Sequence, residues 1–151
     1  MKAIVYLSQS LSTFSEEQLT KMTELFSANN ESQEITGYLF YCQNSFFQYL
    51  EGEEQKVSNL MSKIKADERH KRIRSYEDLD LKNRRFPSWS MKYIGSDTFP
   101  QIGLEKVIKE HFDRIDSNSY FEKRWVERIW GSVTRLADLQ SRLANRKTPP
   151  H

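Results

Sequence analysis

The chain has 151 residues, a formal net charge of +2, 1 cysteine and 3 histidines. This length suits one domain with a small appendage, and it leaves no room for a second catalytic domain. One cysteine cannot form an internal disulfide, and the scattered histidines lack the spacing of metal ligands. The small net charge gives no support to general nucleic-acid binding. We therefore expect a protein of a reducing compartment without a metal site.

The first residues predict a buried strand at residues 3–8. This run is β-rich, and Tyr6 shares a face with Ile4. Its 5 consecutive apolar residues are too few for a signal peptide and far below the roughly 20 of a membrane span. We therefore expect a cytoplasmic protein that is neither exported nor bound to a membrane.

The next segment predicts a helix at residues 16–28. Ser15-Glu16-Glu17-Gln18 is a capping box, and apolar residues follow at helical spacing. Asn29-Asn30 is expected to end this helix. Aromatic runs at residues 35–42 and 45–51, separated by Gln43-Asn44, then predict a β-hairpin. A second helix is predicted at residues 54–66, where the apolar residues are Val57, Leu60, Met61 and Ile64.

Two further strands complete a βαββαββ unit. Residues 71–81 alternate charged and apolar side chains, and residues 89–94 follow Pro87 with Trp89 and Met91 expected on one face. Two helices on one face of a mainly antiparallel sheet form the ferredoxin-like arrangement of the α+β class. After Gly95, amphipathic helices are predicted at residues 102–115 and 119–143, and Ser119-Tyr120-Phe121-Glu122 is a capping box for the second.

The chemistry of the chain does not indicate an enzyme. It has no G-x-S-x-G, P-loop or G-x-G-x-x-G motif. The candidate functional residues are neutral or aromatic, and most of them have an ordinary packing explanation. Gln48 is different because it lies between aromatic residues on a strand. Each buried amide group without a partner costs roughly 1–3 kcal/mol, so something polar should face Gln48.

A basic stretch at residues 63–85 supports an alternative function. It holds 9 lysines and arginines against 5 acidic residues. A light-independent, ferredoxin-like regulatory module would bind a protein or an anionic ligand through this stretch. Mixed charge on a solvated face explains the same pattern. RNA binding on an aromatic sheet is a weaker hypothesis because no RNP-type motif occurs.

Six short motifs, each weak alone, occur together in order and spacing over residues 2 to about 94. They are Tyr6, Asn29-Asn30, Ile35-Thr36-Gly37, Phe47-Gln48-Tyr49-Leu50-Glu51-Gly52, Asp67-Glu68-Arg69-His70 and Phe86-Pro87-Ser88-Trp89-Ser90-Met91. In these motifs the chain resembles the BLUF family, blue-light sensors that use flavin, in its short stand-alone form. The resemblance implies a flavin-binding photosensor domain at residues 1–95 and a helical extension at residues 96–151.

The resemblance also implies noncovalent binding of FAD, with FMN or riboflavin as alternatives. Asn30 and Asn29 would contact the flavin ring, because a carboxamide offers both a donor and an acceptor. Met22 and Ile64 would cover the ring. Lys63, with Arg69 and His70 of the basic stretch, would hold the flavin phosphate. The implied cofactor-binding residues are Tyr6, Met22, Asn29, Asn30, Gln48, Lys63, Ile64, Arg69 and His70.

The photoactive residues implied by the resemblance are Tyr6, Gln48, Trp89 and Met91. Tyr6 would give up an electron and a proton, and the Gln48 amide would rotate or change tautomer to rewire hydrogen bonds. Either Trp89 or Met91 could face Gln48. The implied output is a contact with a separate effector protein or between subunits of a homo-oligomer, without enzymatic turnover and without nucleic acid, membrane or metal.

Overall fold

The computed structural model describes residues 1–95, 103–116 and 123–146. The chain divides into two compact units, Met1–Phe99 and Pro100–His151. The domain boundary predicted after residue 95 meets residues outside the described part, and it stays a prediction.

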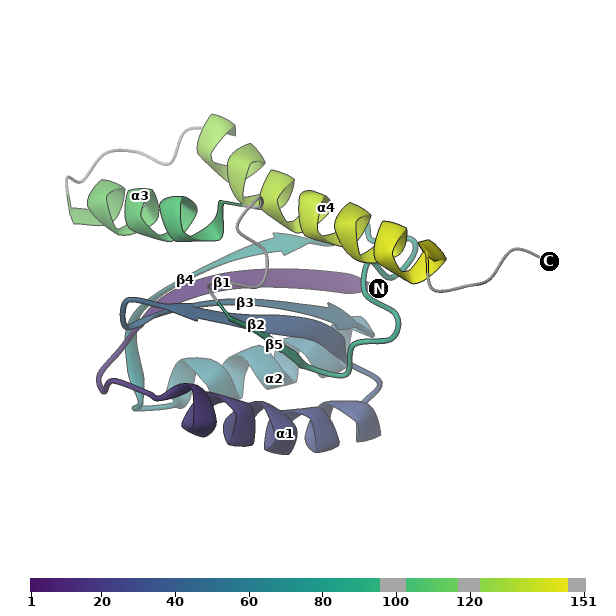
Figure 1. The fold of residues 1–151 in the computed structure, drawn as a ribbon, viewed down its shortest axis with the longest axis horizontal. Coiled ribbons are helices and arrows are strands. Elements are labelled where there is room, and N and C mark those ends of the chain that lie inside the picture. The colour runs from purple at the N-terminus through teal and green to yellow at the C-terminus, as the bar shows by residue number, and fades with distance from the viewer. Residues whose placement is uncertain (96–102, 117–122, 147–151) are drawn as a thin grey trace. The chain divides into compact units, whose positions relative to one another are not determined.

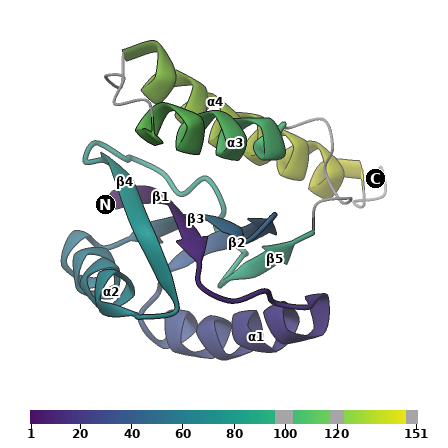
Figure 2. The ribbon, with the colours of Figure 1, turned by 90° about the vertical axis from the view of Figure 1, so that its left-hand side faces the viewer.

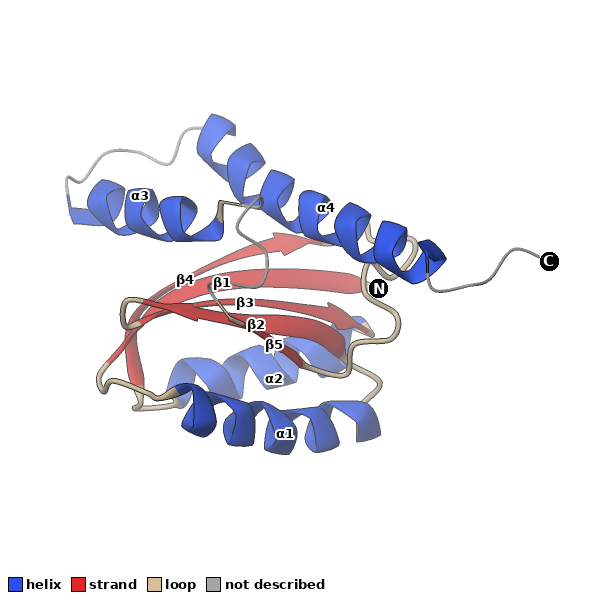
Figure 3. Cartoon of the chain, viewed as in Figure 1, coloured by secondary structure: helices blue, strands red, loops and turns tan. Residues whose placement is uncertain are grey.

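The first unit is built on a five-stranded sheet with the order β4-β1-β3-β2-β5. Neighbouring strands are antiparallel, except that β5 runs parallel to β2 (Figures 1 and 3). The strands are β1 (Lys2–Ser10), β2 (Thr36–Cys42), β3 (Ser45–Gly52), β4 (His70–Asp78) and β5 (Lys92–Ile94).

Helices α1 (Glu16–Ser32) and α2 (Glu54–Ala66) cover one face of this sheet (Figure 2). The expected ferredoxin-like α+β fold is therefore confirmed, as is the capping box: the Ser15 hydroxyl accepts from the Gln18 backbone N–H at 3.2 Å. The expected end of α1 at Asn29-Asn30 is wrong. The helix continues to Ser32, and the Asn30 carbonyl accepts the closing hydrogen bonds from Gln33 and Ile35.

The hairpin between β2 and β3 sets the register of the sheet centre. Gln43 and Asn44 take positive φ angles of 49° and 60°, as a tight hairpin turn requires. In the resulting register Gln48 of β3 lies opposite Tyr6 of β1 and opposite Leu39 of β2. Because side chains alternate along a strand, these three residues project from the same face of the sheet.

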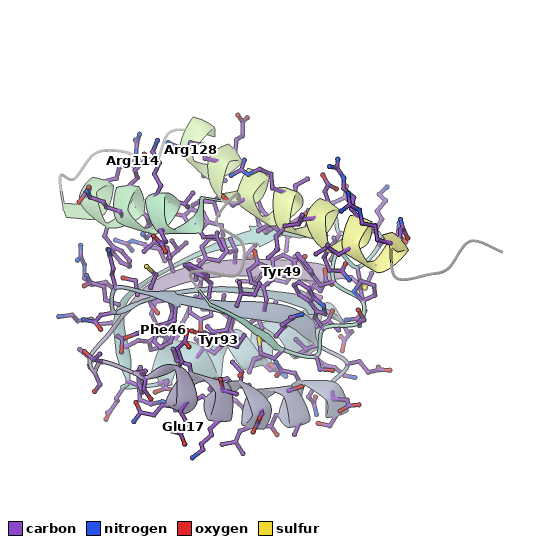
Figure 4. All side chains as sticks on the ribbon, viewed as in Figure 1. Glu17, Phe46, Tyr49, Tyr93, Arg114 and Arg128 are labelled. Carbon is purple, nitrogen blue, oxygen red and sulfur yellow. The ribbon has the colours of Figure 1, made fainter. Side chains whose placement is uncertain are left out.

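That face and the two helices enclose the core of the first unit. Its buried members include Ile4, Leu19, Leu50 and Val57. Phe46 and Tyr93 lie on the helix side of the sheet, whereas Tyr49 lies on the opposite side (Figure 4). The sheet thus separates two environments, and Gln48 belongs to the helix side.

The final strand is shorter than expected. Pairing to β2 begins only at Lys92, and Trp89 and Met91 precede the strand. The Trp89 carbonyl still accepts a hydrogen bond from the Gly37 backbone N–H at 2.7 Å. Because the segment is not extended from residue 89, Trp89 and Met91 do not share a face, and this expectation is wrong.

The second unit contains the two expected amphipathic helices, α3 (Leu104–Asp116) and α4 (Lys123–Arg146). Their buried residues recur at helical spacing, with Leu104, Val107, Ile108 and Phe112 on α3 and Ile129, Val133 and Leu136 on α4. An ion pair between Glu110 and Arg128 joins the two helices. The predicted capping box at residues 119–122 lies outside the described residues. None of the helices in the described ranges is long and apolar enough to cross a membrane.

Candidate functional site

A cavity of about 240 Å³ lies on the helix side of the sheet. Its wall is formed by α1, α2 and the strands between them. All nine residues expected to bind a cofactor line this one cavity: Tyr6, Met22, Asn29, Asn30, Gln48, Lys63, Ile64, Arg69 and His70. The fold therefore brings together side chains from five elements and one loop, which are widely separated along the chain.

Tyr6 and Gln48 form a buried hydrogen-bonded pair in the wall of this cavity. The Tyr6 hydroxyl donates to Gln48 Oε1, and the other end of the amide, Nε2, donates to Met91 Sδ at 3.2 Å. Both Tyr6 and Gln48 are about 95% buried, with 5% of each side chain exposed. The polar partner that the sequence demanded for Gln48 is thus Tyr6 on one side and Met91 on the other.

Burial controls the acidity of Tyr6. Desolvation, helped by the nearby Asp67 carboxylate, raises the pKa of the Tyr6 hydroxyl well above its ordinary value of 10.0. The His70 ring lies edge-on to Tyr6, with ring centroids 6.0 Å apart. Tyr6 therefore keeps its proton at neutral pH and donates it in a hydrogen bond to Gln48.

Asn30 places a carboxamide at the cavity that no residue in the described part of the chain satisfies. The residue is 4% exposed, and its backbone carbonyl is fixed at the end of α1. Its side chain lines the cavity and makes no hydrogen bond within the described ranges. Such a group calls for a ligand edge that carries a donor beside an acceptor, as a flavin ring does. The residues present therefore fit a flavin.

Comparison with known families settles what kind of protein this is. A family model described as sensors of blue-light using FAD matches residues 1–92. The chain belongs to the BLUF family. It is a blue-light sensor whose domain binds flavin.

Three relatives show the extent of the similarity. Photoactivated adenylate cyclase subunit alpha of Euglena gracilis is 39% identical over 70 residues, which are 46% of this chain and 7% of that protein. A bacterial light-regulated adenylyl cyclase of known structure is 34% identical, with a TM-score of 0.67, over 77% of this chain and 36% of that one. The BLUF protein BlrB has a TM-score of 0.67 at 21% identity, over 89% of this chain and 95% of its own, and shows the shared fold. This BLUF chain therefore corresponds to a small part of each cyclase.

Trp89 occupies a different place from Met91 in this BLUF domain. Its ring stacks on Phe86, with centroids 5.0 Å apart, and meets the Tyr38 ring edge-on. Tyr38 alternates with Leu39, which lines the cavity, so Trp89 lies on the sheet face away from Gln48. Of the two residues left open by the sequence, Met91 is the one that contacts Gln48.

The charged rim of the cavity is internally paired. Arg69 Nη2 lies 2.6 Å from Asp67 Oδ2, and the guanidinium sits 5.9 Å from the Phe26 ring centroid. Hydrogen bonding from Arg69 lowers the pKa of the Asp67 carboxyl. His70 uses both ring nitrogens, since Nε2 lies 2.7 Å from the Ile64 carbonyl and Nδ1 2.7 Å from the Ser8 hydroxyl. A carbonyl only accepts, so Nε2 carries the proton.

Five cavity residues were missed by sequence reasoning: Phe26, Leu39, Phe46, Leu60 and Asp67. Two signals could have found four of them. Phe26 lies four residues after Met22 and four before Asn30, and Leu60 lies four before Ile64, so each shares its helix face. Phe46 lies two residues before Gln48 on β3 and so shares its face, and Leu39 lies opposite Gln48 on β2. Asp67 belongs to the motif Asp67-Glu68-Arg69-His70, but the resemblance gave it no role.

In the basic stretch, several cationic side chains already have partners within the chain, which leaves fewer of them to bind an anion. Four of its arginines bond within the chain: Arg69 to Asp67, Arg72 to Gln9, Arg84 to Thr36 and Arg85 to Asp78. Lys63, in contrast, lies exposed at the cavity. Among the described residues, no group of three His, Cys, Asp or Glu side chains is arranged to hold a metal ion.

Proposed function

We propose that this BLUF chain binds FAD in the cavity and reports blue light through the hydrogen bonds of Tyr6 and Gln48. The observation that carries the proposal is a pair of buried hydrogen bonds in the cavity wall. One runs from the Tyr6 hydroxyl to the Gln48 amide oxygen, and the other from the Gln48 amide nitrogen to Met91 Sδ. These two hydrogen bonds join a proton donor, the Tyr6 hydroxyl, to the Gln48 amide, whose two ends have opposite polarity.

The side chains around the cavity divide the work of holding the cofactor. Asn30 and Asn29 would bind the edge of the ring through their carboxamides, and Met22 and Ile64 would pack against its faces. Lys63 would contact a phosphate as a point charge, and Arg69 would join it once it turns from Asp67. His70 is better placed as a wall beside Tyr6 than as a phosphate ligand, because both of its nitrogens are engaged.

The bound flavin would supply blue-light absorption and, once excited, an acceptor for one electron from Tyr6. Tyr6 holds its hydroxyl proton against Gln48 Oε1, so the proton has a short path to the amide oxygen. A rotation or tautomer change of the Gln48 amide alters its bond to Met91 without moving the backbone. One changed hydrogen bond is worth about 1 kcal/mol, which shifts a two-state equilibrium about fivefold.

The output of this switch is proposed to be a protein contact, without turnover by this chain. Two of the named relatives are light-regulated adenylate cyclases, and this chain corresponds to a small part of each. A separate effector protein or a second subunit would therefore respond to the altered segment at Met91. The alternative, a light-independent module that binds an anionic ligand, is disfavoured by the internal pairing of the arginines.

A single experiment tests the proposed function. The full chain is purified with FAD and illuminated with blue light while its absorption spectrum is recorded. The expected sample is yellow, and its flavin absorption shifts to longer wavelength in the light and returns in the dark. A chain that binds no flavin, or binds it and shows no reversible shift, would contradict the proposal. Parallel samples with FMN and riboflavin show which flavin is held most tightly.

A further inference from the structure

Glu51 is a buried carboxylate that the proposed photochemistry does not use. It lies on β3, three residues after Gln48, and its side chain is fully buried with 0% exposed. Alternation along the strand places it on the sheet face opposite Gln48. A buried charge is stable only when it is paired and fully hydrogen-bonded, so its partners should explain its presence.

Four donors converge on this carboxylate, two on each oxygen. Oε1 accepts from the Thr36 hydroxyl at 2.9 Å and from the Phe86 backbone N–H at 2.7 Å. Oε2 accepts from the Tyr49 hydroxyl at 2.7 Å and from the Arg85 backbone N–H at 2.8 Å. Two consecutive backbone N–H groups pointing at one anion form a tight cradle. Glu51 therefore fastens the chain at residues 85–86 to strand β3.

The segment that Glu51 fastens is the one that carries Met91. Residues 85–91, here named the Met91 segment, run from the Glu51 cradle to the contact with Gln48. Inside the segment, the Phe86 and Trp89 rings stack with centroids 5.0 Å apart, which connects the residues bound to Glu51 with the part that precedes Met91. Arg85 adds a side-chain bond from Nη1 to the Tyr49 hydroxyl at 3.1 Å.

Among the points that hold the Met91 segment to strand β3, two lie on opposite faces of the sheet. One point is the Glu51 carboxylate, and the other is the Gln48 amide, three residues away on the same strand. The amide can reverse its polarity, whereas the carboxylate accepts with both oxygens in every orientation. The first point is therefore fixed and the second can change.

We propose that Glu51 is a positioning residue for the photoresponse, which sets the distance between Met91 and Gln48 by anchoring the Met91 segment to β3. This role rests on the proposed function of Tyr6 and Gln48. With the anchor in place, a change at Gln48 alters the contact with Met91 and leaves residues 85–86 where they are. Without it, the segment keeps the bond from the Gly37 N–H to the Trp89 carbonyl but loses its attachment at residues 85–86, so the position of Met91 shifts and the dark state re-forms at a different rate.

The substitution Glu51→Gln isolates this role. Each carboxylate oxygen accepts from one backbone N–H, and a backbone N–H cannot reverse. In either orientation, the amide NH₂ of glutamine would face one of these two donors. The variant therefore breaks one tether while keeping the volume of the side chain, and the exposed Glu24→Gln is the matched control.

The experiment uses the full chain with FAD and two measurements. In the dark, methyl-labelled methionine reports the resonance of Met91 among the 4 methionines of the chain, assigned with Met91→Leu. After illumination, the recovery of the absorption spectrum gives a rate. Glu51→Gln is expected to move the Met91 resonance and to change the recovery rate about fivefold, the effect of one hydrogen bond. Glu24→Gln is expected to change neither.

A double-variant test separates positioning from a general loss of stability. In a Met91→Leu background, Glu51→Gln should leave the recovery rate unchanged, because the group it positions is gone. An unmoved Met91 resonance with a wild-type recovery rate in Glu51→Gln would overturn the proposal. If Glu51→Gln does not fold, Tyr49→Phe removes one donor to Oε2 and keeps the ring, and the same two readouts apply. A wild-type chain without a light-driven shift would instead overturn the proposed function, while the methyl resonance would still decide whether Glu51 positions Met91.

Discussion

Gln48 joins two chemically different neighbours because the ends of its amide differ in polarity. Its oxygen accepts from Tyr6 and its NH₂ group donates to Met91. Leucine has nearly the same volume and neither a donor nor an acceptor. We predict that Gln48→Leu keeps flavin bound and abolishes the light-induced shift, as measured by difference absorption spectroscopy. The exposed Gln55→Leu on α2 is the control, and a normal shift in Gln48→Leu would remove this residue from the mechanism.

Tyr6 contributes a proton as well as a ring. We predict that Tyr6→Phe folds and binds flavin, loses about 1 kcal/mol of stability with its hydrogen bond, and does not form the signalling state. Transient absorption after a blue flash measures that state. Tyr41→Phe is a suitable control because the Tyr41 hydroxyl bonds to Asn44, away from Gln48. Unchanged photocycling in Tyr6→Phe would leave Tyr6 with a structural role only.

Buried tyrosines also make the stability of the fold depend on alkaline pH. Burial raises the pKa of Tyr6 and Tyr49 above the ordinary value of 10.0, so the folded chain keeps protons that the unfolded chain loses. We therefore predict that the free energy of unfolding is maintained up to about pH 10 and falls as the pH rises further. Urea unfolding between about pH 8 and pH 11 measures this, and Tyr6→Phe should show a shallower fall. An equal fall in both chains would contradict the assignment to Tyr6.

At the level of the strands, Gly37 of β2 leaves no room for a side chain against β3. A Cβ atom there would lie 1.9 Å from the Tyr49 carbonyl oxygen, and the Gly37 φ angle is 157°. We predict that Gly37→Ala destabilises the domain by roughly 3 kcal/mol, because backbone atoms must move apart. Gly131→Ala in α4 is the matched control. There the nearest atom is 3.6 Å away, so the helix should gain roughly 0.5–1 kcal/mol. Thermal unfolding of both variants measures the difference.

The elements differ in how well their sequences predicted them. α2 occupies residues Glu54–Ala66 as expected, because its apolar period and its ends agree. α1 was expected to stop at an asparagine pair, but the Asn30 carbonyl closes the helix and its side chain serves the cavity instead. β5 was expected to begin at Trp89. Its pairing to β2 is parallel and long-range, and alternation along one segment does not reveal such pairing.

In the candidate site, too, some features could be predicted from the sequence and others could not. The family resemblance selected nine residues that do line one cavity, although their roles toward a flavin stay predictions. The pairing of Arg69 with Asp67 and the two bonds of His70 were not foreseen, because they depend on side-chain direction. Motifs thus located the cavity, and only coordinates could give the hydrogen bonds within it.

For the whole molecule, we predict a homo-oligomer in the dark whose size or exchange rate changes with light. The buried stripe of α4 continues beyond Leu136 to Leu143, which is 41% exposed. An apolar side chain at the open end of such a stripe suits a contact between subunits. Light scattering on dark and illuminated samples measures the assembly. Leu143→Arg should shift it toward smaller species, whereas Leu25→Arg, at an exposed position of α1, should not. A full chain that is monomeric in both states would exclude signalling by self-association.

The strand order limits which parts of the sheet can change after a photon is absorbed. Strands β1 and β3, which carry Tyr6 and Gln48, are each hydrogen-bonded on both sides. Sliding either strand by one residue would turn every side chain to the wrong face and open two ladders at once. The light-induced change must therefore be confined to side chains at the centre of the sheet. Strand β5 has three residues and one neighbouring strand, so few hydrogen bonds hold it and it can move in response to that change.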